Sequence, residues 1–110
     1  MKVKKSVLAL SSMDFIFTKV SVEEGRVKGV VIVYYTEING RAFQICRIDM
    51  SHGYLHKDLL FEKPKAKIKI KKEISGKTVS ELRQEIIENL ESYREKFFEN
   101  WMKGAENEKK

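Results

Sequence analysis

The sequence predicts an α+β fold, in which an antiparallel meander of five to six strands carries one long C-terminal helix packed on a face. Residues 1–74 contain short runs of β-branched and aromatic residues separated by turn-forming residues, as in a sheet. From Thr78 onward, apolar residues recur at steps of three and four, which is the spacing of an amphipathic helix. The 110 residues suffice for one domain, expected at 1–103, with a frayed polar tail at 104–110.

Each expected strand is a run of β-forming residues between turn signals. The central run is apolar on both faces, and the Asn39-Gly40 step after it favours a tight type I′ hairpin turn. The fifth run is short and is ended by Pro64, which cannot donate a hydrogen bond to a neighbouring strand. In order, the expected strands are residues 3–10, 13–22, 27–38, 41–49, 58–61 and 65–74.

The expected helix begins at a capping box, because Thr78 is followed three residues later by Glu81. Its apolar stripe predicts a length of about 25 residues, and Gly104 is expected to end it. The far end of the stripe is more aromatic than one small sheet needs, so it is a candidate homodimer or partner surface. That aromatic end consists of Phe97, Phe98 and Trp101.

Composition narrows the class of protein. The longest mostly apolar run, residues 30–35, is far shorter than the ~20 residues that a membrane span needs. The single cysteine, Cys46, excludes an internal disulfide and a multi-cysteine metal cluster, and we interpret it as a small buried hydrophobe. Cysteine usage is consistent with a reducing, cytoplasmic location. Charged residues make up 35% of the chain, a proportion typical of thermophilic proteins.

The positive charge is concentrated in one segment. Residues 63–77 contain seven lysines and one glutamate, so they hold the entire net charge of +6. Within this segment, every second residue is a lysine at Lys65, Lys67, Lys69 and Lys71. On a strand these lysines would project from one face, where they could follow the phosphate backbone of a nucleic acid. The alternative interpretation is that they only protect an exposed sheet edge from aggregation.

The candidate catalytic residues are gathered where the fourth expected strand ends, in residues 47–58. They are His52, His56, Asp49, Arg47 and Lys57. Two imidazoles can act as an acid–base pair. In metal-independent RNA cleavage, one would activate the 2′-hydroxyl and the other would protonate the leaving 5′-oxygen. Asp49 would orient one imidazole, and the two cations would stabilise the charge on the phosphorane.

Two other interpretations of this segment remain open. The two histidines and either Asp49 or Asp58 could bind a metal ion, although Gly53 argues against the helix on which a His-x3-His pair usually binds one. Alternatively, the acidic residues cap turns or pair with the neighbouring arginine, and the histidines are ordinary loop residues. Our prediction for this segment includes neither a metal nor another cofactor.

The pattern Arg-x-Asp-x-x-His-Gly-x-x-His-x-Asp of residues 47–58 is similar to the signature of small prokaryotic families related to the TumE-type toxins of toxin–antitoxin systems. The resemblance extends over about residues 27–98, and its specific positions are Arg47, Asp49, His52, Gly53 and His56. It implies strands followed by a C-terminal helix, and a toxin paired with an antitoxin protein. The chain departs from the toxins at Met50, where they often have Asn, and at Lys57-Asp58, where they cluster further histidines.

Two functions are therefore expected from different classes. The first is a toxin-like, nucleic-acid-directed protein that cleaves RNA with its histidine pair. The second is a non-catalytic module that binds nucleic acid or an acidic, antitoxin-like protein through the lysine-rich strand and the aromatic end of the helix.

Overall fold

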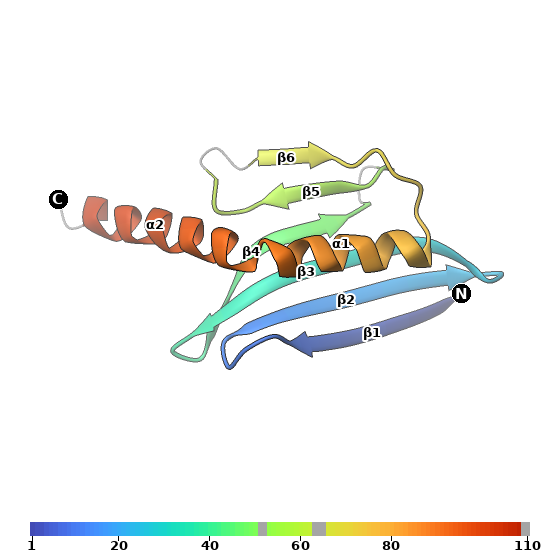
Figure 1. The fold of residues 1–110 in the computed structure, drawn as a ribbon, viewed down its shortest axis with the longest axis horizontal. Helices are drawn as coiled ribbons and strands as arrows, with labels where there is room; N and C mark the ends of the chain where they lie inside the picture. Colours follow the sequence, from blue (N-terminus) through green and yellow to red (C-terminus); the bar gives the residue numbers. More distant parts are fainter. Residues whose placement is uncertain (51–52, 63–65, 109–110) are drawn as a thin grey trace.

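The computed structural model describes residues 1–50, 53–62 and 66–108. Six strands form one sheet in chain order, each antiparallel to the next, and two helices follow them (Figure 1). The elements are β1 (Lys2–Ala9), β2 (Asp14–Glu23), β3 (Arg26–Ile38), β4 (Arg41–Asp49), β5 (His56–Leu59), β6 (Ala66–Lys69), α1 (Gly76–Glu88) and α2 (Leu90–Glu108). The expected α+β meander is confirmed.

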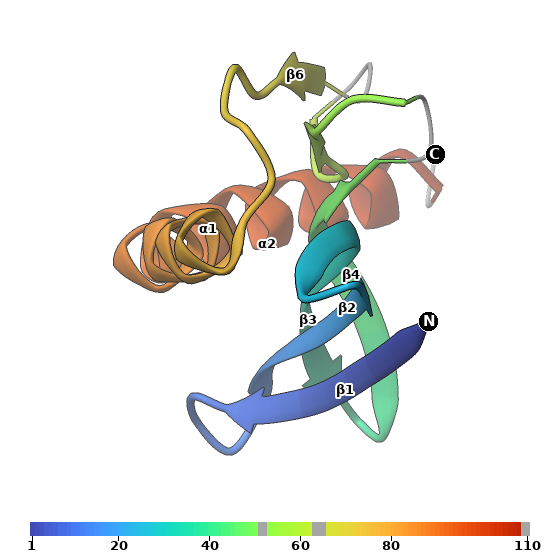
Figure 2. The ribbon, with the colours of Figure 1, turned by 90° about the vertical axis from the view of Figure 1, so that its right-hand side faces the viewer.

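The two faces of the sheet differ in what covers them. Ile16 of β2 and Ile32 of β3 are fully buried, and they pack in one core with Leu82 and Ile86 of α1. In Figure 2, α1 lies on one side of strands β1 to β4. We call this side the helix face. Because side chains alternate along a strand, the neighbours of these core residues point to the opposite side, which we call the open face.

The two long hairpins close through tight turns, and the one at Asn39-Gly40 has the type I′ conformation predicted for it. Asn39 and Gly40, between β3 and β4, have φ of 53° and 78°. Glu24 and Gly25, between β2 and β3, have φ of 51° and 74°. Positive φ at both central residues is the requirement of a type I′ turn, whose twist matches that of the strands it joins. These turns fix the pairing of the three central strands.

The prediction of one continuous C-terminal helix is wrong, because the chain forms two. Asn89 ends α1: its backbone N–H bonds to the carbonyl oxygens of Glu85 and Ile86, and its side-chain amide donates to the Glu85 oxygen at 2.8 Å. An asparagine side chain that bonds to nearby backbone in this way competes with helix continuation. At the other end, α2 runs past Gly104, which therefore does not end the helix.

The start of α1 also differs from the expected capping box. The Ser75 hydroxyl accepts a hydrogen bond from the Thr78 N–H at 3.1 Å, so Ser75 is the N-cap residue. Thr78 lies inside the first turn and donates its own hydroxyl to the Glu73 carbonyl oxygen at 2.6 Å. Glu81 pairs with Lys72 at 3.0 Å instead of reaching back to the cap.

The last two strands are short and lie at the edge of the sheet. β5 begins at His56, two residues before the expected position, and β6 ends at Lys69. Ile68 of β6 is 43% exposed, because it lies on the last strand, at the edge of the sheet. The early start of β5 matters for the candidate site, since it places His56 on a strand that is paired with β4.

The aromatic end of the helical region is used partly within the chain. Phe97 packs against Phe43 of β4, with ring centroids 5.7 Å apart, and Phe98 stands 5.7 Å from Phe97. Trp101 also contacts Phe43, at 6.0 Å, and is still 47% exposed. Within the described part of the chain, neither helix combines the length and the apolar character needed to cross a membrane.

Candidate functional site

Pairing of β4 with β5 brings together four polar side chains from the segment that the sequence singled out. In the register of these strands, Arg47 is opposite Asp58, and Asp49 is opposite His56. All four lie on the open face, because they alternate with Ile48, which is buried on the helix face. We call these four residues the polar cluster.

Asp49 is the centre of the polar cluster. Its Oδ1 is 2.9 Å from His56 Nε2, and its Oδ2 accepts a hydrogen bond from Arg47 Nε at 2.7 Å. Asp58 Oδ2 approaches the same imidazole nitrogen at 3.6 Å. The side chains of His56 and Asp49 are only 1% and 8% exposed, whereas that of Arg47 is 41% exposed. The guanidinium is therefore the most accessible group of the cluster.

The ring of His56 is enclosed by protein atoms. Its Nδ1 lies 3.4 Å from the Tyr54 carbonyl oxygen, while Nε2 faces the two carboxylates. The Tyr54 ring contacts the imidazole at a tilt, with ring centroids 5.6 Å apart and planes at 60°, and Lys69 Nζ lies 5.3 Å from the centre of the tyrosine ring. With both nitrogens directed at protein groups, His56 is arranged to hold Asp49, which in turn holds the Arg47 guanidinium.

The same residues form a candidate metal site. Asp49, His56 and Asp58 each offer one ligand atom, and these atoms all lie within 4.8 Å of one another. Carboxylate oxygens with one imidazole nitrogen suit divalent ions such as Mn²⁺ or Zn²⁺. A backbone carbonyl beside the second ring nitrogen is the usual support of a ligating histidine, and Tyr54 supplies one. The alternative of a metal at this segment thus has a definite set of donors.

Lys57 is not brought to the polar cluster. It points to the helix face, where its ammonium group pairs with Glu85 of α1 and lies 3.2 Å from the Tyr93 hydroxyl of α2. Burial acts to lower the pKa of Lys57, but the hydrogen bonds to Glu85 and Tyr93 outweigh it, so the pKa is raised. The expected role of Lys57 in stabilising a phosphorane is incompatible with this position, and the side chain instead fastens β5 to the helices.

The remaining expected site residues are distributed as follows. Lys67 and Lys69 of β6 are exposed, and they pair across the sheet with Asp58 and His56, beside the polar cluster. Lys71 is exposed just after β6. His52 and Lys65 lie outside the residues that the structure describes.

Cys46 is interpreted correctly as a buried hydrophobe. Its side chain is fully enclosed on the helix face, between the flanking strands. Burial raises the pKa of the Cys46 thiol to about 12, so the reactive thiolate is almost absent near neutral pH.

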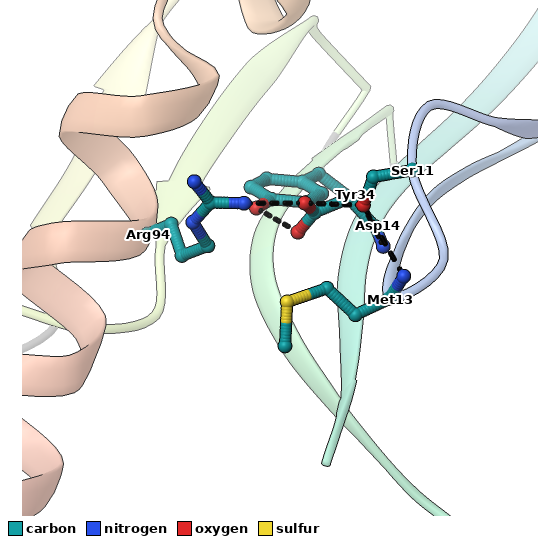
Figure 3. A network of polar contacts seen from close by, with 5 residues as sticks. All are labelled: Ser11, Met13, Asp14, Tyr34 and Arg94. Atoms are coloured by element: carbon teal, nitrogen blue, oxygen red, sulfur yellow. Dashed lines mark hydrogen bonds and ion pairs between the residues drawn. The ribbon is translucent and has the colours of Figure 1, made fainter.

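A second group of polar side chains, on the helix face, was not predicted from the sequence (Figure 3). The Asp14 carboxylate is fully buried and accepts hydrogen bonds from the Tyr34 hydroxyl at 2.7 Å, Arg94 at 2.6 Å and the Ser11 hydroxyl at 2.8 Å. Burial, followed by the bond to Asp14, raises the pKa of Tyr34 far above its usual value. One feature of the sequence could have indicated this group: Asp14 occupies an inward-facing position in the alternating pattern Asp14-x-Ile16-x-Thr18. This group joins α2 to the sheet, so we assign it a structural role.

Comparison with known proteins adds one match. The family model described as "Domain of unknown function (DUF7718)" matches residues 1–103. No curated protein and no solved structure matches the chain.

Proposed function

Because the chain belongs to the DUF7718 family, a domain of unknown function, we propose its function from the site alone: it binds RNA at the polar cluster and cleaves it without a metal ion. One observation carries the proposal. Arg47 is held by Asp49 at 2.7 Å on the same face of the sheet as Lys67 and Lys69. A guanidinium fixed through Nε still has its two terminal amino groups to bind a phosphate.

The proposal gives each group a separate task. Arg47 and the two lysines bind the phosphate and stabilise the negative charge that grows on it during cleavage. His56 is buried against Asp49, so it acts by positioning the arginine. Proton transfer falls to His52, which takes the proton from the attacking 2′-hydroxyl and returns it to the leaving 5′-oxygen. His52 lies outside the described residues and follows Asp49 by three positions. The similarity of residues 47–58 to the TumE-type toxins supports a nucleic-acid-directed, toxin-like role.

The decisive experiment is cleavage of end-labelled RNA by protein treated with EDTA. Wild-type protein should cleave, His52→Ala should be inactive, and Arg47→Ala should lose about 10²- to 10³-fold in rate, as expected for removal of one charge-stabilising donor. Arg41→Ala is the matched control, because Arg41 is an exposed arginine at the opposite end of β4, and this variant should retain activity.

Two outcomes would contradict the proposal. Equal cleavage rates for Arg47→Ala and wild-type protein would show that the polar cluster is not the site of cleavage. Cleavage that needs Mn²⁺ or Zn²⁺ and is abolished by EDTA would show that Asp49, His56 and Asp58 work as metal ligands instead.

A second candidate, a non-catalytic binding module, is favoured by the enclosure of His56, whose two ring nitrogens both face protein atoms. Such a module would bind nucleic acid or an acidic protein through the alternating lysines of residues 65–71 and the aromatic end of α2. It would show no cleavage in the same assay. Its RNA binding would weaken with salt, fail after charge reversal of Lys67, Lys69 and Lys71 to Glu, and be indifferent to His52→Ala.

A further inference from the structure

The open face carries an aromatic and basic surface on β1, β2 and β3. Phe15 of β2 and Tyr35 of β3 are cross-strand neighbours and stack, with ring centroids 5.3 Å apart and planes at 14°. Phe17 follows two residues later on the same side of β2, and all three aromatic side chains are half-buried. We call these three rings, together with Lys5 and Lys19, the platform.

The two lysines of the platform form an unfavourable pair. Lys5 of β1 and Lys19 of β2 are directly opposite each other in the register of the sheet. Like charges at directly opposite positions destabilise a strand pair. Among residues 1–50, 53–62 and 66–101, whose side chains the structure describes, no carboxylate forms an ion pair with either ammonium group. An anion bound between them would relieve the repulsion.

The platform is hollowed and leads to the polar cluster. A shallow groove of about 530 Å³ is lined by Phe17, Tyr35, Lys5, Lys19 and Arg47. A second hollow of about 290 Å³ shares Lys19 and Arg47 with the first and extends to Asp49. Every described residue that lines either hollow belongs to β1–β4 or directly follows β4.

We propose that the platform binds single-stranded RNA, with bases stacked on Phe17 and on the Phe15–Tyr35 pair and phosphates held by Lys5, Lys19 and Arg47. Aromatic rings on the face of a sheet stack with bases that are not already paired within a duplex. A row of cations beside such rings is the usual means of following a backbone. This inference rests on the proposed function for its choice of RNA, but it needs no cleavage.

Binding is best measured by fluorescence anisotropy with a labelled single strand of ~12 nucleotides, a length within the range that one such domain covers. The strand is 2′-O-methyl RNA, which lacks the nucleophile for cleavage and so is not consumed. Phe17→Leu keeps an apolar side chain but removes the stacking surface, and should weaken binding at least about fivefold. The duplex of the same sequence should bind more weakly than the single strand.

The electrostatic part of the proposal has a matched pair of variants on one strand. Lys5→Glu and Lys4→Glu change the net charge equally, but Lys4 pairs with Val20 and projects from the helix side of β1. Lys5→Glu should weaken binding several-fold more than Lys4→Glu. The plot of log affinity against log salt concentration should also become less steep by about 0.7, the contribution of one phosphate contact on a single strand. Both lysines are exposed, so neither variant threatens folding.

The outcomes separate this inference from the proposed function. Binding that depends on Lys5 and Phe17, without any cleavage of ordinary RNA, would support the platform and refute the ribonuclease. Absence of binding by wild-type protein, equal effects of the two lysine variants, or preference for the duplex would each overturn the platform. A dimer in sedimentation that Lys5→Glu dissociates would also overturn it, because the face would then be covered by a second copy.

Discussion

At the scale of single residues, the best-defined interaction is the buried carboxylate of Asp14. It is fully enclosed yet accepts three hydrogen bonds, one of them from the cationic Arg94 of α2 (Figure 3). A buried charge is tolerated only with such partners, and removal of one partner costs more than the pair contributes. Arg94 therefore ties the second helix to the first turn of the sheet, 80 residues away in sequence.

We predict that Arg94→Met destabilises the protein by about 3 kcal/mol, because the Asp14 charge loses its cation while buried. Urea unfolding followed by circular dichroism measures the change. Lys96→Met is the control, because Lys96 is exposed on α2, and it should stay within about 0.5 kcal/mol of wild type. The double variant Asp14→Asn, Arg94→Met should recover part of the loss. An Arg94→Met effect no larger than that of Lys96→Met would show that the ion pair does not hold the helix.

At the scale of elements, the helical region depends on two short-range contacts that the apolar stripe did not reveal. Ser75 caps α1 through the Thr78 N–H, and Asn89 interrupts the helix by bonding to Glu85. Both residues are polar side chains that bond to backbone close in sequence. The stripe continues through Asn89 because Ile86 and Leu90 still face the core.

Substitution of the cap distinguishes the two possible starts of α1. Ser75→Ala should destabilise the protein by about 1 kcal/mol, the usual cost of losing an N-cap side chain. Glu81→Gln should cost clearly less than Ser75→Ala, since Glu81 pairs with Lys72 on the exposed surface, where solvent screens the interaction. Thermal unfolding of both variants at neutral pH tests this. The reverse order of effects would mean that Thr78 and Glu81 form the cap after all.

The strands could be predicted from sequence more fully than the site, for a physical reason. Each strand pairs with its neighbour in the chain, so local patterns and the Asn39-Gly40 turn determine most of the sheet. The start of β5 at His56 depends instead on pairing with β4, which no local pattern encodes. Once β5 starts there, alternation sends Lys57 to the helix face and gathers His56 with Asp49. Moving the start of β5 by two residues thus changes which side chains belong to the site.

At the scale of the whole molecule, the two faces of the sheet have separate tasks. The helix face holds the core, the Asp14 group and the ion pair between Lys57 and Glu85, all of which join helices to strands. The open face holds the polar cluster and the platform. Substitutions at its accessible cations, Arg47 and Lys5, should therefore affect binding, whereas those on the helix face should affect stability.

The buried Cys46 thiol and Tyr34 hydroxyl of the helix face also make the stability of the whole protein sensitive to high pH. The folded protein raises the pKa of the Cys46 thiol from its ordinary 9.0 to about 12. Above pH 9 the unfolded chain releases this proton while the folded protein keeps it, so the unfolded state binds fewer protons and the free energy of unfolding falls as pH rises. This loss continues up to about pH 12, and Tyr34 adds a similar loss that begins near its ordinary value of 10.0.

Cys46→Ala should therefore flatten the alkaline decline in stability. Between pH 9 and 12, its free energy of unfolding should fall less steeply than that of wild type, by up to about 1.4 kcal/mol per pH unit, the value for one proton. Urea titrations at intervals from pH 7 to 12 give both slopes. The comparison uses slopes because the smaller side chain lowers stability at every pH by a similar amount. Parallel curves for the two proteins would mean that the folded state does not retain the thiol proton, and that water or a cation reaches Cys46 on the helix face.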